Sequence, residues 1–163
     1  MPTITIRFAS PDDVPIILDF IKGLAAFENE LDAVKTTQAD LLRDGFGPQP
    51  KFEVLVAELA AEPVGFALFF LTYSTWEGRP SLYLEDLFVV ESARKHGVGR
   101  QLMARLAAIA VERGYKRLDL QVLNWNPARE FYRRLDMDHM YDWLPYRLSG
   151  KTLQKLAAES KHS

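Results

Sequence analysis

The sequence contains no cysteine among its 163 residues. A disulfide framework, a thiolate nucleophile and a cysteine-ligated zinc site are therefore excluded. No apolar run approaches the roughly 20 residues that a membrane-spanning helix needs, so we expect no membrane partner. An excess of positive charge is also missing, because the net charge is −2 and the pI is near 5.9, and we therefore expect no nucleic-acid partner.

The first residues, MPTITIRFAS, lack the basic start and long apolar stretch of a signal peptide, and with the absence of cysteine this predicts a cytoplasmic protein. His96, His139 and His162 show no metal-ligand spacing, so we expect no metal. What is present is a composition of 48% hydrophobic residues, which can close one sizeable core. Because no repeat or linker interrupts the chain, we expect a single domain over residues 1–163.

Alternation of apolar and polar residues predicts strands, whereas apolar stripes with capping residues predict helices. The SPDD stretch, for example, offers an N-cap, a proline and two acids for a helix start. The predicted strands are 3–8, 52–59, 64–73, 81–90, 118–122 and 143–148. The predicted helices are 11–27, 37–43, 97–113, one that begins at Asn126 and Pro127, and 152–159.

The connections between these elements predict how the strands pair. The turn-like stretches AAEP and STWEGRP are short enough for antiparallel neighbours. A whole helix separates strand 81–90 from strand 118–122, and a connection of that length indicates a parallel pair with a right-handed crossover. An antiparallel meander followed by one parallel pair is therefore expected.

The stretch VVESARKHGVGRQLM joins a strand to a helix through a loop that contains Gly97 and Gly99. Unpaired backbone N–H groups at a helix start form an anion site, and glycine lets a ligand approach them closely. Arg94, Lys95 and His96 add positive charge, so a phosphate or pyrophosphate is one interpretation. The other is that the glycines only shape the turn and that the charges are solvated. Neither a Walker loop nor a three-glycine dinucleotide pattern is present.

RKHGVG resembles the R/Q-x-x-G-x-G/A pyrophosphate loop of the GNAT family of acetyl-CoA-dependent N-acetyltransferases. Five further segments resemble, in order, the diamine (spermidine/spermine) acetyltransferase subfamily and its thialysine-acetylating relatives: LAAFENE, DLLRDGFG, VGFALFFLTYSTWEG, LYLEDLFV and WNPAREFYRR. The resemblance covers about residues 6–156. It implies the α/β GNAT fold, with a mixed, mostly antiparallel sheet flanked by helices, acetyl-CoA between splayed parallel strands, and a homodimer.

The resemblance also assigns binding residues. Those that match cofactor-binding positions are Leu87, Phe88, Val89, Arg94, Lys95, His96, Gly97, Val98, Gly99, Arg100, Asn126 and Tyr132. Those that match the walls around a small cationic amine are Phe27, Glu28, Glu85, Asp119, Leu120 and Gln121. A polyamine, thialysine or a lysine-like molecule would each suit acidic walls.

An ammonium group has a pKa near 10.4, so it must lose a proton before it can attack a thioester. Glu85 and Asp86 are adjacent on a strand, where successive side chains face opposite sides, and we expect only one of them to face the cleft. The resemblance favours Glu85 as the base, acting directly or through water. From the residues alone, both could equally be structural carboxylates.

Tyr132 matches the family's general acid, which protonates the leaving sulfur, whereas the residues alone also allow a core aromatic beside Phe131. The chain departs from the family at Asp136, which replaces a glycine at a helix end. The stretch before Tyr132 is one residue short, so Asn124 could replace Asn126 as the cofactor contact. An N-acetyltransferase is expected, with a non-catalytic acyl-CoA-binding sensor as the alternative.

Overall fold

The structure is a computed structural model that describes residues 2–161, so His162, one of the three histidines without metal-ligand spacing, lies outside the described residues. Most predicted elements are present, with ends that shift by one to three residues. The strands are β1 (Ile4–Phe8), β2 (Glu53–Leu59), β3 (Glu62–Ser74), β4 (Arg79–Val89) and β5 (Leu118–Leu120). The helices are α1 (Val14–Phe27), α2 (Gln38–Phe46), α3 (Val98–Glu112), α4 (Ala128–Arg134) and α5 (Gly150–Ala157), with 3-10 turns η1 (Pro11–Asp13), η2 (Leu31–Ala33) and η3 (Glu91–Ala93).

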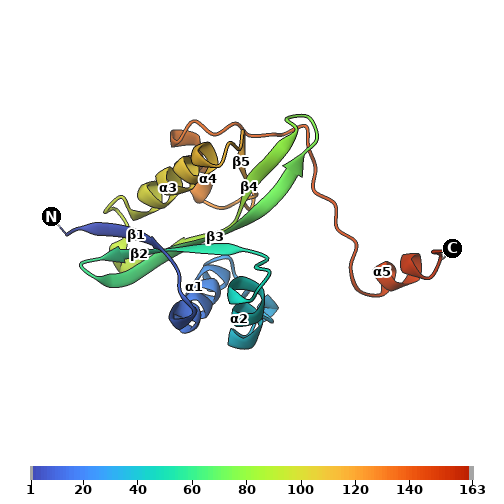
Figure 1. Cartoon of the computed structure of the whole chain (residues 1–163), viewed down its shortest axis with the longest axis horizontal. Helices are drawn as coiled ribbons and strands as arrows, with labels where there is room; N and C mark the ends of the chain where they lie inside the picture. Colours follow the sequence, from blue (N-terminus) through green and yellow to red (C-terminus); the bar gives the residue numbers. More distant parts are fainter. Residues whose placement is uncertain (1, 162–163) are drawn as a thin grey trace. The chain divides into compact units, whose positions relative to one another are not determined.

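The five strands of the described residues form one sheet in the order β1-β2-β3-β4-β5. Neighbouring strands are antiparallel as far as β4, and β5 pairs with β4 in parallel after the crossover through α3. Helices α1 and α2 cover one face of this sheet and α3 covers the other (Figure 1). The predicted fold class, a mixed and mostly antiparallel sheet flanked by helices, is confirmed.

The core explains why both faces of the sheet are covered. On α1, the residues Ile17 and Phe20 are buried and pack with Phe66 of β3. On α3, the buried residues Leu102 and Leu106 form the predicted apolar stripe. Burial of such side chains is the main favourable contribution to folding. Among the helices of residues 2–161, none is long and apolar enough to cross a membrane.

By its internal contacts the chain divides into two compact units, one that ends at Leu123 and one that begins at Asn124. The second unit contains α4 and α5. At the end of α4, Asp136 adopts the left-handed conformation with φ of 61°, and its N–H donates to the Arg133 carbonyl at 3.0 Å. The aspartate therefore takes, at this helix end, the left-handed conformation that glycine adopts most readily.

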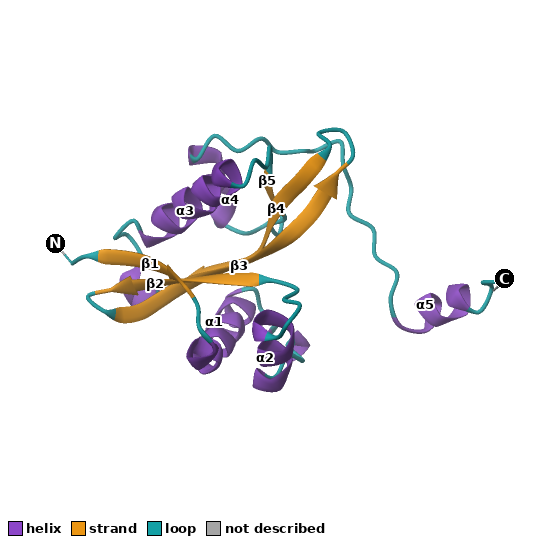
Figure 2. Cartoon of the chain, viewed as in Figure 1, coloured by secondary structure: helices purple, strands orange, loops and turns teal. Residues whose placement is uncertain are grey.

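The predicted strand over residues 143–148 is wrong. Figure 2 shows this part of the second unit as loop, and Tyr146 is 93% exposed. Pro145 lies in the middle of the segment, and a proline has no N–H group to donate to a neighbouring strand. Aromatic and branched residues gave the segment a strand-like pattern, although a strand also needs a partner.

The turn between β2 and β3 carries an unfavourable backbone conformation. Leu59 pairs with Glu62, so only Ala60 and Ala61 form the turn, with φ of 52° and 67°. Two-residue hairpins of this type need positive φ at both positions, which glycine and asparagine adopt most readily. For an L-residue with a Cβ, such a conformation costs about 1–2 kcal/mol.

We therefore expect the double substitution Ala60→Asn and Ala61→Gly to raise the free energy of unfolding by about 1 kcal/mol. The relief of backbone strain should exceed the destabilisation that comes from the greater conformational freedom of glycine in the unfolded chain. Urea unfolding measures this change. Ala107→Gly, at an exposed position inside α3, should instead lower stability by about 1 kcal/mol. A double variant less stable than the parent would contradict the strain argument.

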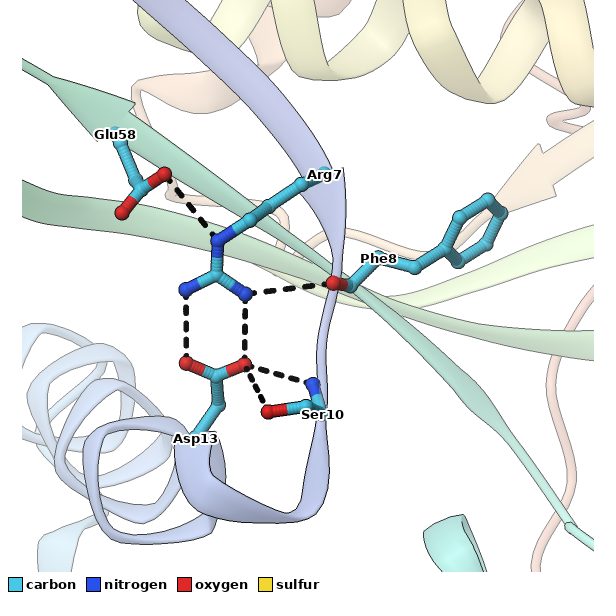
Figure 3. Close-up of polar contacts among 5 residues, drawn as sticks. All are labelled: Arg7, Phe8, Ser10, Asp13 and Glu58. Carbon is cyan, nitrogen blue, oxygen red and sulfur yellow. Dashed lines mark hydrogen bonds and ion pairs between the residues drawn. The ribbon is translucent and has the colours of Figure 1, made fainter. Parts of the chain in front are cut away.

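A charged cluster fixes the start of α1 against β1 (Figure 3). Arg7 on β1 donates to both carboxylate oxygens of Asp13 at 2.8 and 2.9 Å, and its Nε donates to Glu58 at 3.2 Å. The Ser10 N–H also donates to Asp13 at 2.7 Å, which forms a capping box at the helix start that the SPDD stretch predicts. These hydrogen bonds, with that from Arg7 first, lower the pKa of Asp13 below 3.8.

We expect Asp13→Asn to lower the free energy of unfolding by about 1.5–3 kcal/mol at pH 7, because it weakens hydrogen bonds to a charged group. The stabilisation from Asp13 is present above its unfolded pKa of about 3.9 and is lost as the pH falls through the lower folded pKa. Urea unfolding at pH 7 and pH 3 should therefore show a smaller difference at pH 3. Asp12→Asn, on the exposed neighbour, is the control and should stay within about 0.5 kcal/mol.

Candidate active site

A cavity of about 480 Å³ lies in the first unit, where α1 and α2 meet β3 and β4. Its lining combines apolar side chains with several carboxylates and a guanidinium. The lining residues are Ile21, Thr36, Asp40, Leu41, Arg43, Asp44, Phe52, Leu68, Glu85 and Asp86. A concave site with a few polar groups on an apolar wall is typical of small-molecule binding.

A β-bulge on β4 brings two acids to this cavity. Asp86 pairs with Leu68 and Leu84 pairs with Phe69, so Glu85 is the extra residue of the bulge. The expectation that only one acid faces the cleft is wrong, because the bulge breaks the regular alternation and both Glu85 and Asp86 line the cavity. Glu85 is exposed, whereas Asp86 is half-buried.

Of the two acids on the bulge, Asp86 is the one whose pKa is clearly shifted. Burial, followed by the charges of Glu85 and Glu28, raises the pKa of Asp86 from 3.8 to about 6. Burial and the neighbouring Glu30 also raise the pKa of Glu28 above its usual value. A carboxylate with a pKa near the working pH is suited to act as a general base. Asp86 was not among the predicted site residues, because its burial is a property of the folded chain and not of a local sequence motif.

Beyond the bulge, β4 separates from β5. In the described part of the chain, their pairing ends at Leu84 and Leu120, whereas β4 continues to Val89. The backbone of residues 85–89 therefore has one edge that β5 does not cover. Leu87, Phe88 and Val89, which are among the predicted cofactor-binding residues, lie in this stretch, and its edge can pair with an extended ligand.

The loop after β4 has the backbone of an anion site. Gly97 is the N-cap of α3 with φ of 82°, and Lys95 also has a positive φ of 73°. No side chain caps the helix start within the described residues. Val98 is buried and anchors the loop, while His96 and Arg100 are exposed beside it. The structure thus provides backbone N–H groups and cations at one helix end, which fits a pyrophosphate.

The side chain of Arg94 is held against the protein. Its Nε donates to the Val89 carbonyl at 2.9 Å. Its guanidinium lies 5.5 Å from the ring centroid of Phe27 and 5.8 Å from that of Phe88. Phe88 is itself closely packed, because a Cβ at Gly23 of α1 would lie 2.8 Å from the ring. Arg94 therefore joins the loop to the end of α1 and the end of β4.

Besides Glu85 on β4, the predicted amine walls occupy two places, the end of α1 and β5 with the residue that follows it. Phe27 and Glu28 lie at the end of α1, and Glu28 is close enough to Asp86 to raise its pKa. Asp119 and Leu120 are on β5, where Asp119 pairs with Tyr83, and Gln121 follows that strand as an exposed residue. The part of the cavity lining that α2 provides, here called the α2 wall, was not predicted; it consists of Asp40, Leu41, Arg43 and Asp44. Its sequence signal is the spacing of acids four residues apart at positions 40 and 44, which places them on one helix face.

The other predicted residues belong to the second unit. Asn126 is buried, and its Oδ1 accepts a hydrogen bond from the Ala128 N–H at 2.9 Å at the start of α4, where Pro127 occupies the N-cap position. Tyr132 is half-buried on α4, and its ring meets Phe131 edge-on at 5.2 Å between centroids. The backbone oxygen of Asn124 accepts from Arg129 at 2.8 Å. Among residues 2–161, no group of three or more histidines or acids could hold a metal ion.

Comparison with known proteins gives consistent matches. Residues 22–137 match the acetyltransferase (GNAT) family. A thialysine N-epsilon-acetyltransferase of Bos taurus is 35% identical over 98% of this chain and 100% of its own length. A human spermidine/spermine N(1)-acetyltransferase-like protein 1 is 39% identical over 94% of this chain but only 24% of its own length.

Among solved structures, an integron cassette protein from the mobile metagenome of V. cholerae superposes with a TM-score of 0.78 at 27% identity. That match covers 96% of this chain and 98% of the other. The two sequence relatives bear the names of an acetyltransferase and an acetyltransferase-like protein, and the matches do not support the alternative of a non-catalytic sensor.

Proposed function

Because this chain belongs to the GNAT family of acetyltransferases, we propose that it is an acetyl-CoA-dependent N-acetyltransferase for a small cationic amine. The observation that carries the proposal is the cavity with Glu85 and Asp86 on its wall, next to the uncovered edge of β4. Acids on an apolar wall attract an ammonium group, and the strand edge offers hydrogen bonds to the pantetheine arm.

Acetyl-CoA supplies, when bound, an acetyl group whose bond to sulfur is replaced by a bond to the amine nitrogen. Glu85 and Asp86 hold the incoming ammonium group, and Asp86 receives its proton. Glu85 assists this proton transfer, either directly or through a water molecule. The pKa of Asp86, about 6, lies about two units closer to the ammonium pKa near 10.4 than the pKa of an ordinary aspartate does. This smaller difference in pKa favours the proton transfer.

The remaining residues hold the cofactor and protonate the product. Backbone N–H groups of residues 95–99, with the side chains of Lys95, His96 and Arg100, bind the pyrophosphate. Leu87, Phe88 and Val89 pair with the pantetheine arm, and Asn126 contacts the cofactor. The Tyr132 hydroxyl donates a proton to the leaving thiolate. Phe27, Glu28, Asp119, Leu120 and Gln121 form the walls around the amine.

The direct experiment is an assay of thiol release from acetyl-CoA with a panel of amines that contains polyamines, thialysine and lysine. Mass spectrometry of the amine identifies the acetylated nitrogen. We expect thiol release to require a primary amine and to yield one acetylated amine for each thiol. Thiol release without an acetylated amine, or no release with any amine, would contradict the proposal.

For the cofactor loop we expect Gly99→Glu to weaken coenzyme A binding at least about tenfold, since a carboxylate in the first turn of α3 repels a pyrophosphate. Isothermal titration calorimetry measures the affinity. Ala104→Glu adds the same charge at an exposed position further along α3, and it should change the affinity much less. Equal effects of the two substitutions would place the pyrophosphate elsewhere.

The proposal includes a cytoplasmic homodimer without a metal or a nucleic-acid partner. Absence of cysteine suits a reducing compartment. Large apolar side chains exposed in the second unit, among them Met140, Leu144 and Tyr146, support contact with a second copy. Light scattering in solution, which gives the mass of the particle, tests the dimer.

A further inference from the structure

Arg94 lies in a loop that is anchored on both sides. Its own N–H donates to the Glu91 carbonyl at 3.1 Å, at the end of the 3-10 turn η3. Ala93, directly before it, and Val98, at the start of α3, are buried. Arg94 itself is exposed, yet its side chain makes contacts that lead away from the loop in two directions.

The first contact is with the edge of β4 that β5 leaves uncovered. Val89 pairs with Gly65 of β3, and the next residue, Val90, donates its N–H to the Val64 carbonyl at 2.8 Å. In an antiparallel ladder the hydrogen-bonding groups of successive residues point to alternate edges, so the Val89 carbonyl points away from β3. The Nε of Arg94 donates to this carbonyl at 2.9 Å. Arg94 is therefore tied to the edge that the pantetheine arm uses in the proposed function.

The second contact is with two aromatic rings that belong to different elements. The Cζ of Arg94 lies 5.5 Å from the ring centroid of Phe27, the last residue of α1, and 5.8 Å from that of Phe88 on β4. Both distances are within the range of a cation–π attraction. Phe88 has little room to shift, since a Cβ on Gly23 would lie 2.8 Å from its ring. Phe27 is 41% exposed at a helix end, so it is the partner whose position Arg94 can change most.

The end of α1 leads on to the proposed amine site. Glu28 follows Phe27 directly, and its N–H donates to the Leu24 carbonyl at 3.0 Å, which is one of the last hydrogen bonds of the helix. After burial and the charge of Glu85, the charge of Glu28 is the next cause that raises the pKa of Asp86. A displacement of this helix end therefore changes the electrostatic environment of the proposed base.

We propose that Arg94 is a positioning residue that couples the coenzyme A loop to the amine site through Phe27 at the end of α1. This inference rests on the proposed function and concerns how its two sites communicate. When the loop holds the cofactor, its backbone is fixed, and the guanidinium of Arg94 in turn holds Phe27 and, with it, Glu28. Coupling of two binding sites is reciprocal, so the cofactor and the amine should each strengthen the binding of the other.

Hydrogen–deuterium exchange measures this coupling without an amine. The N–H groups of Glu28, Asn29 and Glu30 donate to carbonyls of α1, so their exchange reports the opening of that helix end. Saturating coenzyme A should slow their exchange about two- to fivefold in the parent enzyme, as a cation–π contact at an exposed site provides. Arg94→Gln should abolish this slowing, whereas Arg94→Lys, which keeps the charge, should retain part of it.

Two further variants separate the coupling from cofactor binding itself. Lys95→Gln is the matched control, since Lys95 is the adjacent cation of the loop and is exposed. It should weaken coenzyme A binding, but the slowing at the end of α1 should persist once coenzyme A is saturating. Phe27→Leu removes the ring at the other end of the link, so it should abolish the slowing while the affinity for coenzyme A stays nearly unchanged.

Calorimetry tests the coupling from the side of the amine. Spermidine and lysine are titrated into the parent enzyme and into Arg94→Gln, each with and without saturating coenzyme A. In the parent, coenzyme A should tighten the binding of at least one of the two amines by about two- to fivefold, and Arg94→Gln should remove this difference. If coenzyme A tightens the binding of neither amine, the inference is overturned.

The proposed function and this inference fail in different ways. If the enzyme acetylates no amine, the proposed function fails, whereas the exchange experiment still tests the link by itself. The inference is overturned if coenzyme A slows exchange in the loop but not at the end of α1, or if Arg94→Gln keeps the slowing. Weaker coenzyme A binding by Arg94→Gln with unchanged slowing would instead make Arg94 a ligand of the pyrophosphate.

Discussion

Tyr132→Phe is expected to slow turnover by about 10²- to 10⁴-fold while the affinity for acetyl-CoA stays nearly unchanged. The substitution removes one hydroxyl group, whereas the ring keeps its edge-on contact with Phe131. A general acid contributes by protonating the leaving group in the transition state, so its loss lowers kcat and kcat/KM together. The thiolate of coenzyme A would then have to leave without a proton.

Single-turnover kinetics, which report the chemical step, and calorimetry with coenzyme A measure the two parts of this expectation. Tyr73→Phe is the matched control, because Tyr73 lies on β3, outside α4, and is 65% exposed. It should leave turnover unchanged. If Tyr132→Phe retained full turnover while chemistry limits the rate, Tyr132 would be a packing residue of α4.

Much of the fold could be predicted from local patterns. The SPDD motif marked the start of the first helix, and a capping box with Asp13 forms there. The long connection between the strands that end at Val89 and Leu120 predicted the one parallel pair of the sheet. The glycine pair marked the loop at the start of α3, where Gly97 has the positive φ that glycine permits.

The errors arose where the outcome depends on residues distant in sequence. The bulge at Glu85 depends on the register between β4 and β3, so strict alternation gave the wrong orientation for the two acids. The aromatic stretch 143–148 had the composition of a strand, but in the second unit it is loop. The raised pKa of Asp86 follows first from its burial in the folded chain, which no local motif records.

Asp86→Asn is expected to lower turnover at pH 7 by about 10²-fold or more and to remove the acidic limb near pH 6 from the pH dependence of kcat/KM. Loss of that limb follows because the group with the raised pKa of about 6 is gone. Activity should partly recover at higher pH, where the free amine fraction rises about tenfold per pH unit toward 10.4. Initial rates between pH 5 and 10 measure both effects.

The stability of the same variant distinguishes a catalytic effect from misfolding. The folded-state pKa of Asp86 is raised, so its ionisation destabilises the fold as the pH rises from 3.8 through about 6. A neutral asparagine avoids this cost, and Asp86→Asn should be at least as stable as the parent in urea at pH 8. An inactive variant that also unfolds at lower urea would point to a structural role.

Glu85→Gln should give a different result, because the charge of Glu85 is one cause of the raised pKa of Asp86. Its removal lowers that pKa, so the acidic limb should persist but move to lower pH. Turnover at pH 7 should fall less than in Asp86→Asn, by about tenfold, since the proton acceptor remains. If Glu85→Gln removed the limb and Asp86→Asn only shifted it, Glu85 would be the base and Asp86 the residue that tunes it.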